Sequence, residues 1–176
     1  MIKDLITRFS TTTENQEKGI FSTLFIAGNK LQTLFDSRIP KLSLKQFMLL
    51  SILRQAKAPM TLTQLGNVLG CSRQNVKKIA TVLEKKQFVT FEKSPDDARA
   101  IRICPTLQAD AYFKDEFVPY MKELKILFEV YSEEEIHTLY HLMMKMYHGI
   151  ERLENKTKSS VFPKKEETYY ENSRHL

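Results

Sequence analysis

The chain of 176 residues has only two cysteines and five glycines, and it lacks any long uninterrupted apolar run. The two cysteines, Cys71 and Cys104, argue against a disulfide scaffold and are typical of a reducing compartment. No apolar run approaches the roughly 20 residues that a membrane-spanning helix needs. The N-terminal residues also lack the continuous apolar region of a secretory signal. We therefore predict a cytoplasmic protein with no membrane partner.

Motifs of catalysis are missing as well. The sequence has no nucleophile elbow, no phosphate-binding glycine loop and no metal-protease helix. Five glycines also leave little material for a loop that would cradle a cofactor. We predict that the protein is not an enzyme and holds no cofactor. Its formal net charge of +6 instead favours a polyanionic partner, although the location of the charge matters more than its total.

Residues 61–84 have the pattern of two helices joined by a tight turn. Thr61 and Gln64 have the spacing of a capping box that starts the first helix. Gly70 suits the left-handed residue that ends it, and Ser72 suits the cap of the second helix. This pattern predicts a helix-turn-helix, a motif that binds duplex DNA. We expect the apolar side of the first helix to consist of Leu65, Val68 and Leu69.

The second helix has an apolar and a polar face. The apolar residues recur at helical spacing and are expected inside: Val76, Ile79, Ala80 and Leu83. The other positions are expected to contact DNA: Ser72, Arg73, Gln74, Asn75, Lys77, Lys78 and Thr81. Arg pairs with guanine through two hydrogen bonds, and Gln or Asn pairs with adenine in the same way. Lys suits phosphate better, because its ammonium group is a point charge without a planar fork.

Two segments that alternate apolar and polar residues, 88–93 and 100–104, predict a β-hairpin beside this motif. The hairpin would form the wing of a winged helix-turn-helix. The turn-rich loop between the strands contains Asp97 and Arg99. We expect Arg99 to enter the minor groove, where the negative potential attracts arginine, and Asp97 to hold the tip rigid.

Lys93 and Arg102 flank this loop and are candidate phosphate contacts. The bland alternative for these residues is an ordinary charged turn. The helix-turn-helix that precedes the hairpin favours the DNA-binding interpretation, because fold, turn and charge then agree.

Helices are also predicted on both sides of the middle module. Ile20, Phe21 and Phe25 belong to a first helix that ends before Pro40, and a helix from about Leu107 is bent or restarted at Pro119. These flanking helices are too apolar to stand free in water, so packing against a second copy is the economical solution. We predict a mainly α-helical fold with four parts: an N-terminal dimerisation helix (14–40), a winged helix-turn-helix domain (41–106), C-terminal dimerisation helices (107–155) and a mobile, polar, basic tail (156–176).

The segment 44–106 resembles the MarR family of winged helix-turn-helix regulators. The resemblance depends on Leu44-Lys-Gln-Phe-Met-Leu-Leu, Thr61-Leu-Thr-Gln-Leu-Gly, Ser72-Arg-Gln-Asn-Val, Leu83-Glu-Lys-Lys-Gln-Phe-Val and the wing sequence Asp96-Asp97-Ala98-Arg99-Ala100. It implies a homodimer with two recognition helices in successive major grooves of a pseudo-palindromic site. It often implies a small aromatic or amphipathic effector between the dimer helices and the DNA-binding lobe. We expect a repressor; the alternative is a winged helix that binds proteins, or DNA nonspecifically, without an operator.

Several side chains could respond to an oxidant, a metal ion or a small ligand, and each also has a purely structural interpretation. Cys71 beside the recognition helix fits either a redox switch or a small buried filler, and Cys104 supports sensing no better. His137 and His141 share a helix face at a spacing that can chelate a metal, but a lone pair of this kind is more typical of an ordinary surface or interface. We predict no metal site. Aromatic residues could line a ligand pocket or belong to the core or the dimer interface: Phe21, Phe25, Phe35, Phe47, Tyr112, Phe113, Phe117 and Tyr120.

Overall fold

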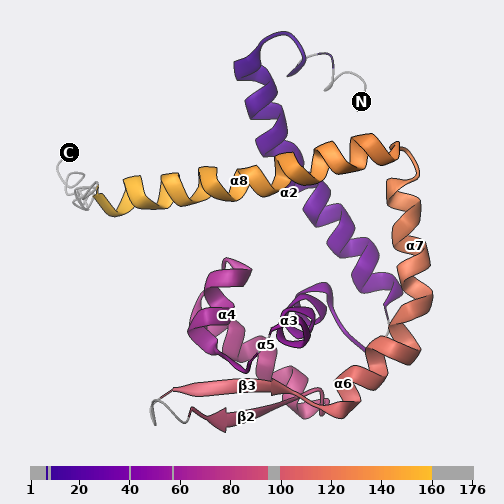
Figure 1. Ribbon diagram of the computed structural model, residues 1–176, viewed down its shortest axis with the longest axis vertical. Helices are drawn as coiled ribbons and strands as arrows, with labels where there is room; N and C mark the ends of the chain where they lie inside the picture. The colour runs from indigo at the N-terminus through magenta and orange to yellow at the C-terminus, as the bar shows by residue number, and fades with distance from the viewer. Residues whose placement is uncertain (1–6, 8, 40, 57, 95–99, 160–176) are drawn as a thin grey trace, which may run out of the picture. The chain divides into compact units, whose positions relative to one another are not determined.

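The computed structural model describes residues 7, 9–39, 41–56, 58–94 and 100–159 (Figure 1). These residues form mainly helices, with one small antiparallel sheet. The chain divides after Glu123 into two compact units. In chain order the elements are α2 (Thr13–Arg38), α3 (Leu44–Gln55), β1 (Met60–Thr61), α4 (Leu62–Leu69), α5 (Arg73–Lys85), β2 (Val89–Lys93), β3 (Ile101–Pro105), α6 (Leu107–Ala111), the π-helix η1 (Tyr112–Phe117), α7 (Val118–Phe128) and α8 (Glu133–Ser159).

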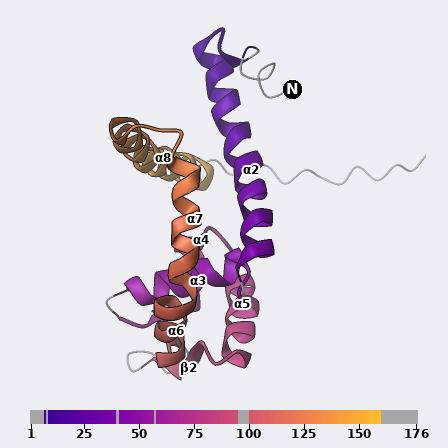
Figure 2. The same ribbon diagram turned by 90° about the vertical axis from the view of Figure 1, so that its right-hand side faces the viewer.

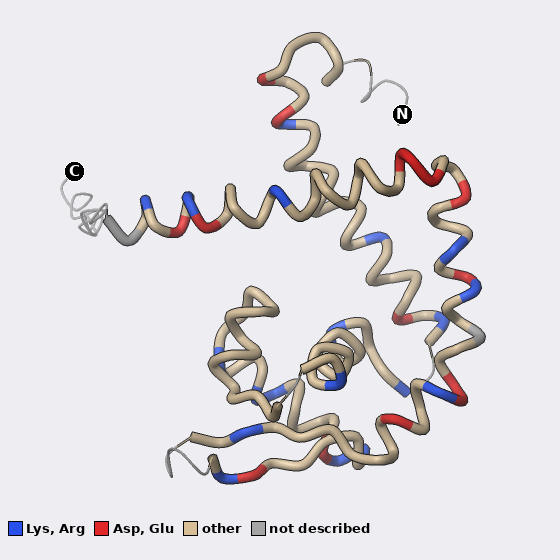
Figure 3. Tube along the Cα trace, in the orientation of Figure 1, with Lys and Arg blue, Asp and Glu red and all other residues tan. Residues whose placement is uncertain are grey.

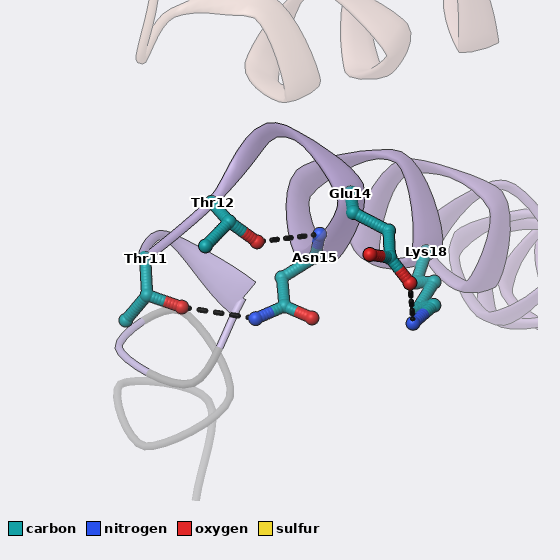
Figure 4. Close-up of polar contacts among 5 residues, drawn as sticks. All are labelled: Thr11, Thr12, Glu14, Asn15 and Lys18. Carbon is teal, nitrogen blue, oxygen red and sulfur yellow. Dashed lines mark hydrogen bonds and ion pairs between the residues drawn. The ribbon is translucent and has the colours of Figure 1, made fainter.

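The start of α2 is fixed by side chains of its own first turn (Figure 4). Thr12 has extended backbone, and its hydroxyl accepts a hydrogen bond from the Asn15 amide at 3.2 Å. The Asn15 side chain donates back to the Thr11 hydroxyl at 2.9 Å. Glu14, in this first turn, pairs with Lys18 one turn later and lies near the positive end of the helix dipole. The helix is therefore capped locally, yet it buries none of its residues.

The core of the first unit lies between α3, α4, α5 and the sheet. Figure 1 shows these three helices on one side of the hairpin formed by β2 and β3. The fully buried large side chains are Leu49, Leu50, Leu65, Leu83, Ile103, Val76 and Val89. The prediction for α4 was wrong at Val68, which is 58% exposed. Leu62 and Gly66 are buried on this helix instead, so its inward face is turned away from Val68.

The sheet contains one more strand than the predicted hairpin. Its order is β1-β3-β2, and both pairings are antiparallel. Ile103 of β3 lies opposite Met60 of β1 on one side and opposite Phe91 of β2 on the other. β1 has two residues, too few to produce an alternating pattern in the sequence. It connects the start of the helix-turn-helix to the wing.

The segment after the sheet is interrupted, as Pro119 predicts, but in an unexpected way. α6 is followed by a π-helical segment, η1, that ends two residues before this proline. The α-helix α7 then follows without a break (Figure 2). Proline has no backbone N–H, so the preceding turn loses one helical hydrogen bond. π-helical insertions are one of the recognised ways in which a helix absorbs such a defect.

α8 forms most of the described part of the second unit. Its first turn contains Glu133, Glu134 and Glu135, which Figure 3 shows as a red stretch at the start of the helix. A capping box starts the helix: the Glu135 amide donates to the Ser132 hydroxyl at 3.2 Å, and the Ser132 amide donates to the Glu135 carboxylate at 2.8 Å. The predicted boundary of the tail was wrong, because α8 continues to Ser159. The rest of the predicted tail, 160–176, lies outside the described residues.

None of the helices in the described part of the chain combines the length and the apolar character that crossing a bilayer requires.

Candidate nucleic-acid interface

The turn between α4 and α5 brings the two helices into close contact. Gly70 adopts a left-handed conformation at φ 63°, as predicted, and ends α4. The Cys71 amide then donates to the Gly66 carbonyl at 2.9 Å. A Cβ atom on Gly66 would lie 2.6 Å from the Cys71 carbonyl oxygen, so glycine is required at this position. The prediction from the sequence overlooked this requirement; a glycine four residues before the turn was the available signal.

α5 separates its apolar and polar residues as predicted. Ser72 caps the helix, and its hydroxyl accepts a hydrogen bond from the Asn75 amide at 3.2 Å. Val76, Ala80 and Leu83 are fully buried, and Ile79 packs against the same core. The predicted DNA contacts that are exposed are Ser72, Arg73, Gln74, Asn75, Lys77 and Lys78. Val82, Glu84 and Lys85 near the end of the helix are exposed as well. Thr81 differs from the prediction, because it is half-buried on the flank of the helix.

The C-terminal end of α5 is tied to other parts of the first unit. The Phe88 amide donates to the Leu83 carbonyl at 2.9 Å, which closes the last turn. The ammonium group of Lys86 donates to the Lys41 carbonyl and, at 3.1 Å, to the Gln46 side chain. Thr106 donates its hydroxyl proton to the Gln87 carbonyl at 2.7 Å. The inward role of Lys86 was missed, because nothing in the sequence distinguishes it from its neighbour Lys85.

The wing is described only in its strands. Lys93 is exposed at the end of β2, and Arg102 is half-buried on β3 opposite Glu92. Figure 3 shows blue, basic segments on both strands of the hairpin, and on β2 a red, acidic segment beside the blue one. The structure therefore places Lys93 and Arg102 on adjacent strands, as expected. Asp97 and Arg99 lie outside the described residues.

The two cysteines occupy different environments. Cys71 is half-buried and packs against the hydrophobic core, which agrees with the filler interpretation. Burial raises the pKa of the Cys104 thiol from 9.0 to about 11, with a hydrogen bond and a charge repulsion from Glu92 acting in the same direction. Arg102 opposes this shift. Because the thiolate is the reactive form, Cys104 is poorly suited to oxidant sensing near neutral pH.

The structure places most of the aromatic candidates in the core. Phe47 contacts the rings of Phe35 and Phe117 at centroid distances of 5.0 and 4.4 Å. Phe113 joins this group, and the Arg54 guanidinium lies 4.2 Å above its ring centroid. The six members that are buried in the core or packed against it are Phe35, Phe47, Tyr112, Phe113, Phe117 and Tyr120. The other two, Phe21 and Phe25, are exposed on α2 and contact each other.

Among the residues that the structure describes, three ion pairs connect the segment from α2 to α3 with the segment from α6 to α7. Arg54 pairs with Asp110 at 2.8 Å, and Lys41 pairs with Glu116 at 2.6 Å. The third pair joins Arg38 to Glu123 at 2.7 Å. All three lie in the first unit and are partly or largely exposed, so each contributes little to stability alone. Lys41 connects two groups, since its carbonyl accepts from Lys86 and its ammonium group contacts η1.

The sequence profile of the MarR family matches residues 42–101. The chain is also 34% identical over 106 residues to the uncharacterized HTH-type transcriptional regulator YcgE of Bacillus subtilis strain 168. That alignment covers 58% of this chain and 68% of YcgE. The chain belongs to the MarR family. Its winged helix-turn-helix architecture is therefore the one that the family uses for transcription regulation.

Solved MarR-family structures share the fold. A mutant MarR of Escherichia coli complexed with operator DNA has a TM-score of 0.66 and 20% identity, and the match covers 77% of this chain and 99% of that one. BpsR of Bordetella bronchiseptica, whose DNA binding is regulated by 6-hydroxynicotinic acid, has a TM-score of 0.63 and 21% identity over 79% of this chain and 95% of that one. At these identities the likeness concerns the fold of the chain.

Proposed function

We propose that this MarR-family protein is a homodimeric repressor that binds a pseudo-palindromic operator in duplex DNA. The observation that carries the proposal is the division of α5. Its inward apolar residues are buried or half-buried and only Val82 is exposed among the apolar ones, while Arg73, Gln74 and Asn75 are exposed together at its N-terminal end. In helix-turn-helix proteins this end of the recognition helix contacts the base edges in the major groove.

Within this proposal the side chains have separate roles. Arg73, Gln74 and Asn75 read bases, because their planar groups match guanine or adenine through paired hydrogen bonds. Lys77 and Lys78 bind phosphates. The Ser72 hydroxyl accepts from the Asn75 amide and still has a proton to donate to a phosphate oxygen. Since Thr81 is half-buried, its proposed contact is limited to the flank of the groove.

The wing completes the contact. Lys93 and Arg102 are proposed to bind phosphates beside the recognition helix, and Arg99 to enter the adjacent minor groove. Asp97 is proposed to hold the tip of the wing. The exposed position of Lys93 supports the first of these roles. The basic segments of both strands in Figure 3 agree with a polyanionic partner.

The proposed dimer is supported by apolar surface outside the winged helix domain. α2 exposes Phe21 and Phe25 at 64% and 61%, and it buries none of its residues. α8 exposes apolar side chains along its length, including Tyr147 at 64%. Exposed patches of this kind are typical of interaction surfaces. A twofold dimer would present two copies of α5 about 34 Å apart, one turn of the DNA helix.

A small aromatic or amphipathic effector belongs to the same proposal. The support is the regulation of BpsR by 6-hydroxynicotinic acid, which is an aromatic acid. Such an effector would bind more tightly to a dimer arrangement that does not fit the operator than to the one that does. The loss of DNA affinity can then be no larger than the ratio of the effector's two affinities.

Selection of bound sequences from a random duplex library, with purified protein at physiological salt, tests the proposal. We expect enrichment of an inverted repeat whose half-sites are about 10 bp apart. On the enriched site, Arg73→Ala should weaken binding by about 1–3 kcal/mol and relax the specificity at one position. Lys30→Ala, which changes an exposed residue of α2, is the matched control and should leave affinity unchanged. Binding without an enriched motif would contradict the proposal and favour a nonspecific DNA-binding or protein-binding module.

A further inference from the structure

α8 contains three of the four histidines of the chain. They are His137, His141 and His148, at spacings of four and seven residues that place them on the same side of the helix. All three are exposed. His148 has no histidine one turn away in either direction, because positions 144 and 152 are Met and Arg. α8 therefore holds one histidine pair and one isolated histidine in similar surroundings.

The pair is closer than shared spacing alone requires. The Nε2 atoms of His137 and His141 are 3.0 Å apart. The ring centroids are 4.5 Å apart, and the ring planes are inclined by 77°. In the neutral pair one Nε2 carries a proton and donates to the lone pair of the other. Two ring nitrogens thus lie within hydrogen-bond distance of each other on an exposed helix face.

We propose that His137 and His141 form a bidentate binding site for a divalent transition-metal ion such as Cu²⁺, Ni²⁺ or Zn²⁺. Imidazole suits all three ions. At a metal–nitrogen distance of about 2.0–2.1 Å, two ligands at a right angle are about 2.9 Å apart, and two tetrahedral ligands are about 3.4 Å apart. The Nε2 separation of 3.0 Å, a hydrogen-bond distance in the free pair, lies between these two values, so one ion can contact both nitrogens.

Binding changes the protonation of one ring without changing its charge. Both Nε2 atoms must present a lone pair to the metal, so the proton that joins them in the free protein moves to Nδ1 of the same ring. Among the described residues no third His, Cys, Asp or Glu joins the pair, so Glu134 does not complete the site and water fills the other positions.

The metal, the two histidine side chains and the backbone between them would form a closed ring across one turn of α8. Such a ring holds the helix between His137 and His141 and stabilises it, because the metal binds the helical conformation better than the unfolded one. This consequence is independent of DNA binding, and the site can be tested by metal binding alone.

The test is calorimetric titration of Ni²⁺ and Cu²⁺ into the full chain, purified without a histidine tag. We expect saturable binding of one ion per chain, with Cu²⁺ bound more tightly than Ni²⁺. His141→Gln should lower the affinity at least tenfold. His148→Gln is the matched control, because it removes an exposed histidine of the same helix, and it should leave the affinity unchanged.

Electron paramagnetic resonance of the Cu²⁺ complex gives a second measurement. The wild-type spectrum should show coupling to two imidazole nitrogens, and that of His141→Gln to at most one. Far-ultraviolet circular dichroism of each variant verifies that α8 is still folded. Absence of saturable binding, undiminished binding by His141→Gln, or equal losses in His141→Gln and His148→Gln would each overturn the proposal.

Discussion

The winged helix-turn-helix domain and the long helices α2 and α8 contain similar apolar residues, but these residues have opposite environments. In the domain, leucines such as Leu49 and Leu50 are fully buried. On α2, Phe21 and Phe25 remain more than half exposed. Three helices and a sheet enclose the core of the domain, whereas a single long helix can bury its apolar face only against another element. The comparison shows that local patterning alone does not create a core.

The helices of both regions begin with side-chain caps. The Ser43–Gln46 and Thr61–Gln64 capping boxes start helices of the domain. Ser132 and Glu135 do the same for α8, and Thr12 caps α2. The difference between the regions is therefore one of tertiary burial. This difference can be tested by substitutions that act on one region and spare the other.

The largest expected effect is that of a cavity in the domain. Leu50→Ala removes a side chain that is fully buried in α3. We expect a loss of about 2–5 kcal/mol in the free energy of unfolding, from lost burial and from the cavity. Denaturant unfolding at a fixed protein concentration measures it. Met48→Ala on the same helix is the control: Met48 is 43% exposed, and its replacement should have a much smaller effect. Equal losses would show that the domain has no closed core of its own.

The next effect concerns the exposed face of α2 in the proposed dimer. Phe25→Ala should raise the dissociation constant of the dimer roughly 10- to 100-fold, because burial of a Phe side chain contributes about 1.5–3 kcal/mol. Sedimentation equilibrium over a range of concentrations measures this change. Lys30→Ala, an exposed polar position of the same helix, should have no effect. A wild-type chain that stays monomeric throughout would remove the explanation that we propose for this exposed surface.

Glycine substitutions should have opposite signs in the two regions. Gly66→Ala brings a Cβ within 2.6 Å of the Cys71 carbonyl oxygen and should destabilise the domain by about 1–3 kcal/mol. A Cβ at Gly149 of α8 meets nothing within 4 Å. Gly149→Ala should therefore stabilise the protein by about 0.5–1 kcal/mol, the usual gain of alanine over glycine inside a helix. Thermal unfolding of the two variants measures both signs, and stabilisation by Gly66→Ala would contradict the close approach at the turn.

The smallest expected effects are those of substitutions at two lysines, Lys78 in α5 and Lys86 at its C-terminal end. Lys78→Ala should reduce the slope of log affinity for DNA against log salt concentration by about one, because one phosphate contact is lost. Lys86→Met should leave the slope unchanged and lower the affinity about fivefold, since it removes hydrogen bonds of about 1 kcal/mol that position α5. Fluorescence anisotropy at several salt concentrations distinguishes the two results. A reduced slope for Lys86→Met would instead assign Lys86 to the DNA.

Some features of this structure depend on residues that are close in the sequence, and others depend on residues that are far apart. The sequence alone correctly predicted the N-terminal caps of α4 and α5, the left-handed Gly70 and the inward positions of α5. Each of these features depends on residues within two turns of one another, where hydrogen bonding and helical spacing follow directly from residue type.

Only the tertiary structure decided the features that join distant segments. It paired the two residues of β1 with β3, turned Val68 outward and bound Lys86 to Lys41 and Gln46, which precede it by 45 and 40 residues. It also left the apolar faces of α2 and α8 exposed. The physical reason is that burial and long-range hydrogen bonds depend on which elements meet in space, and no local pattern in the sequence specifies that meeting.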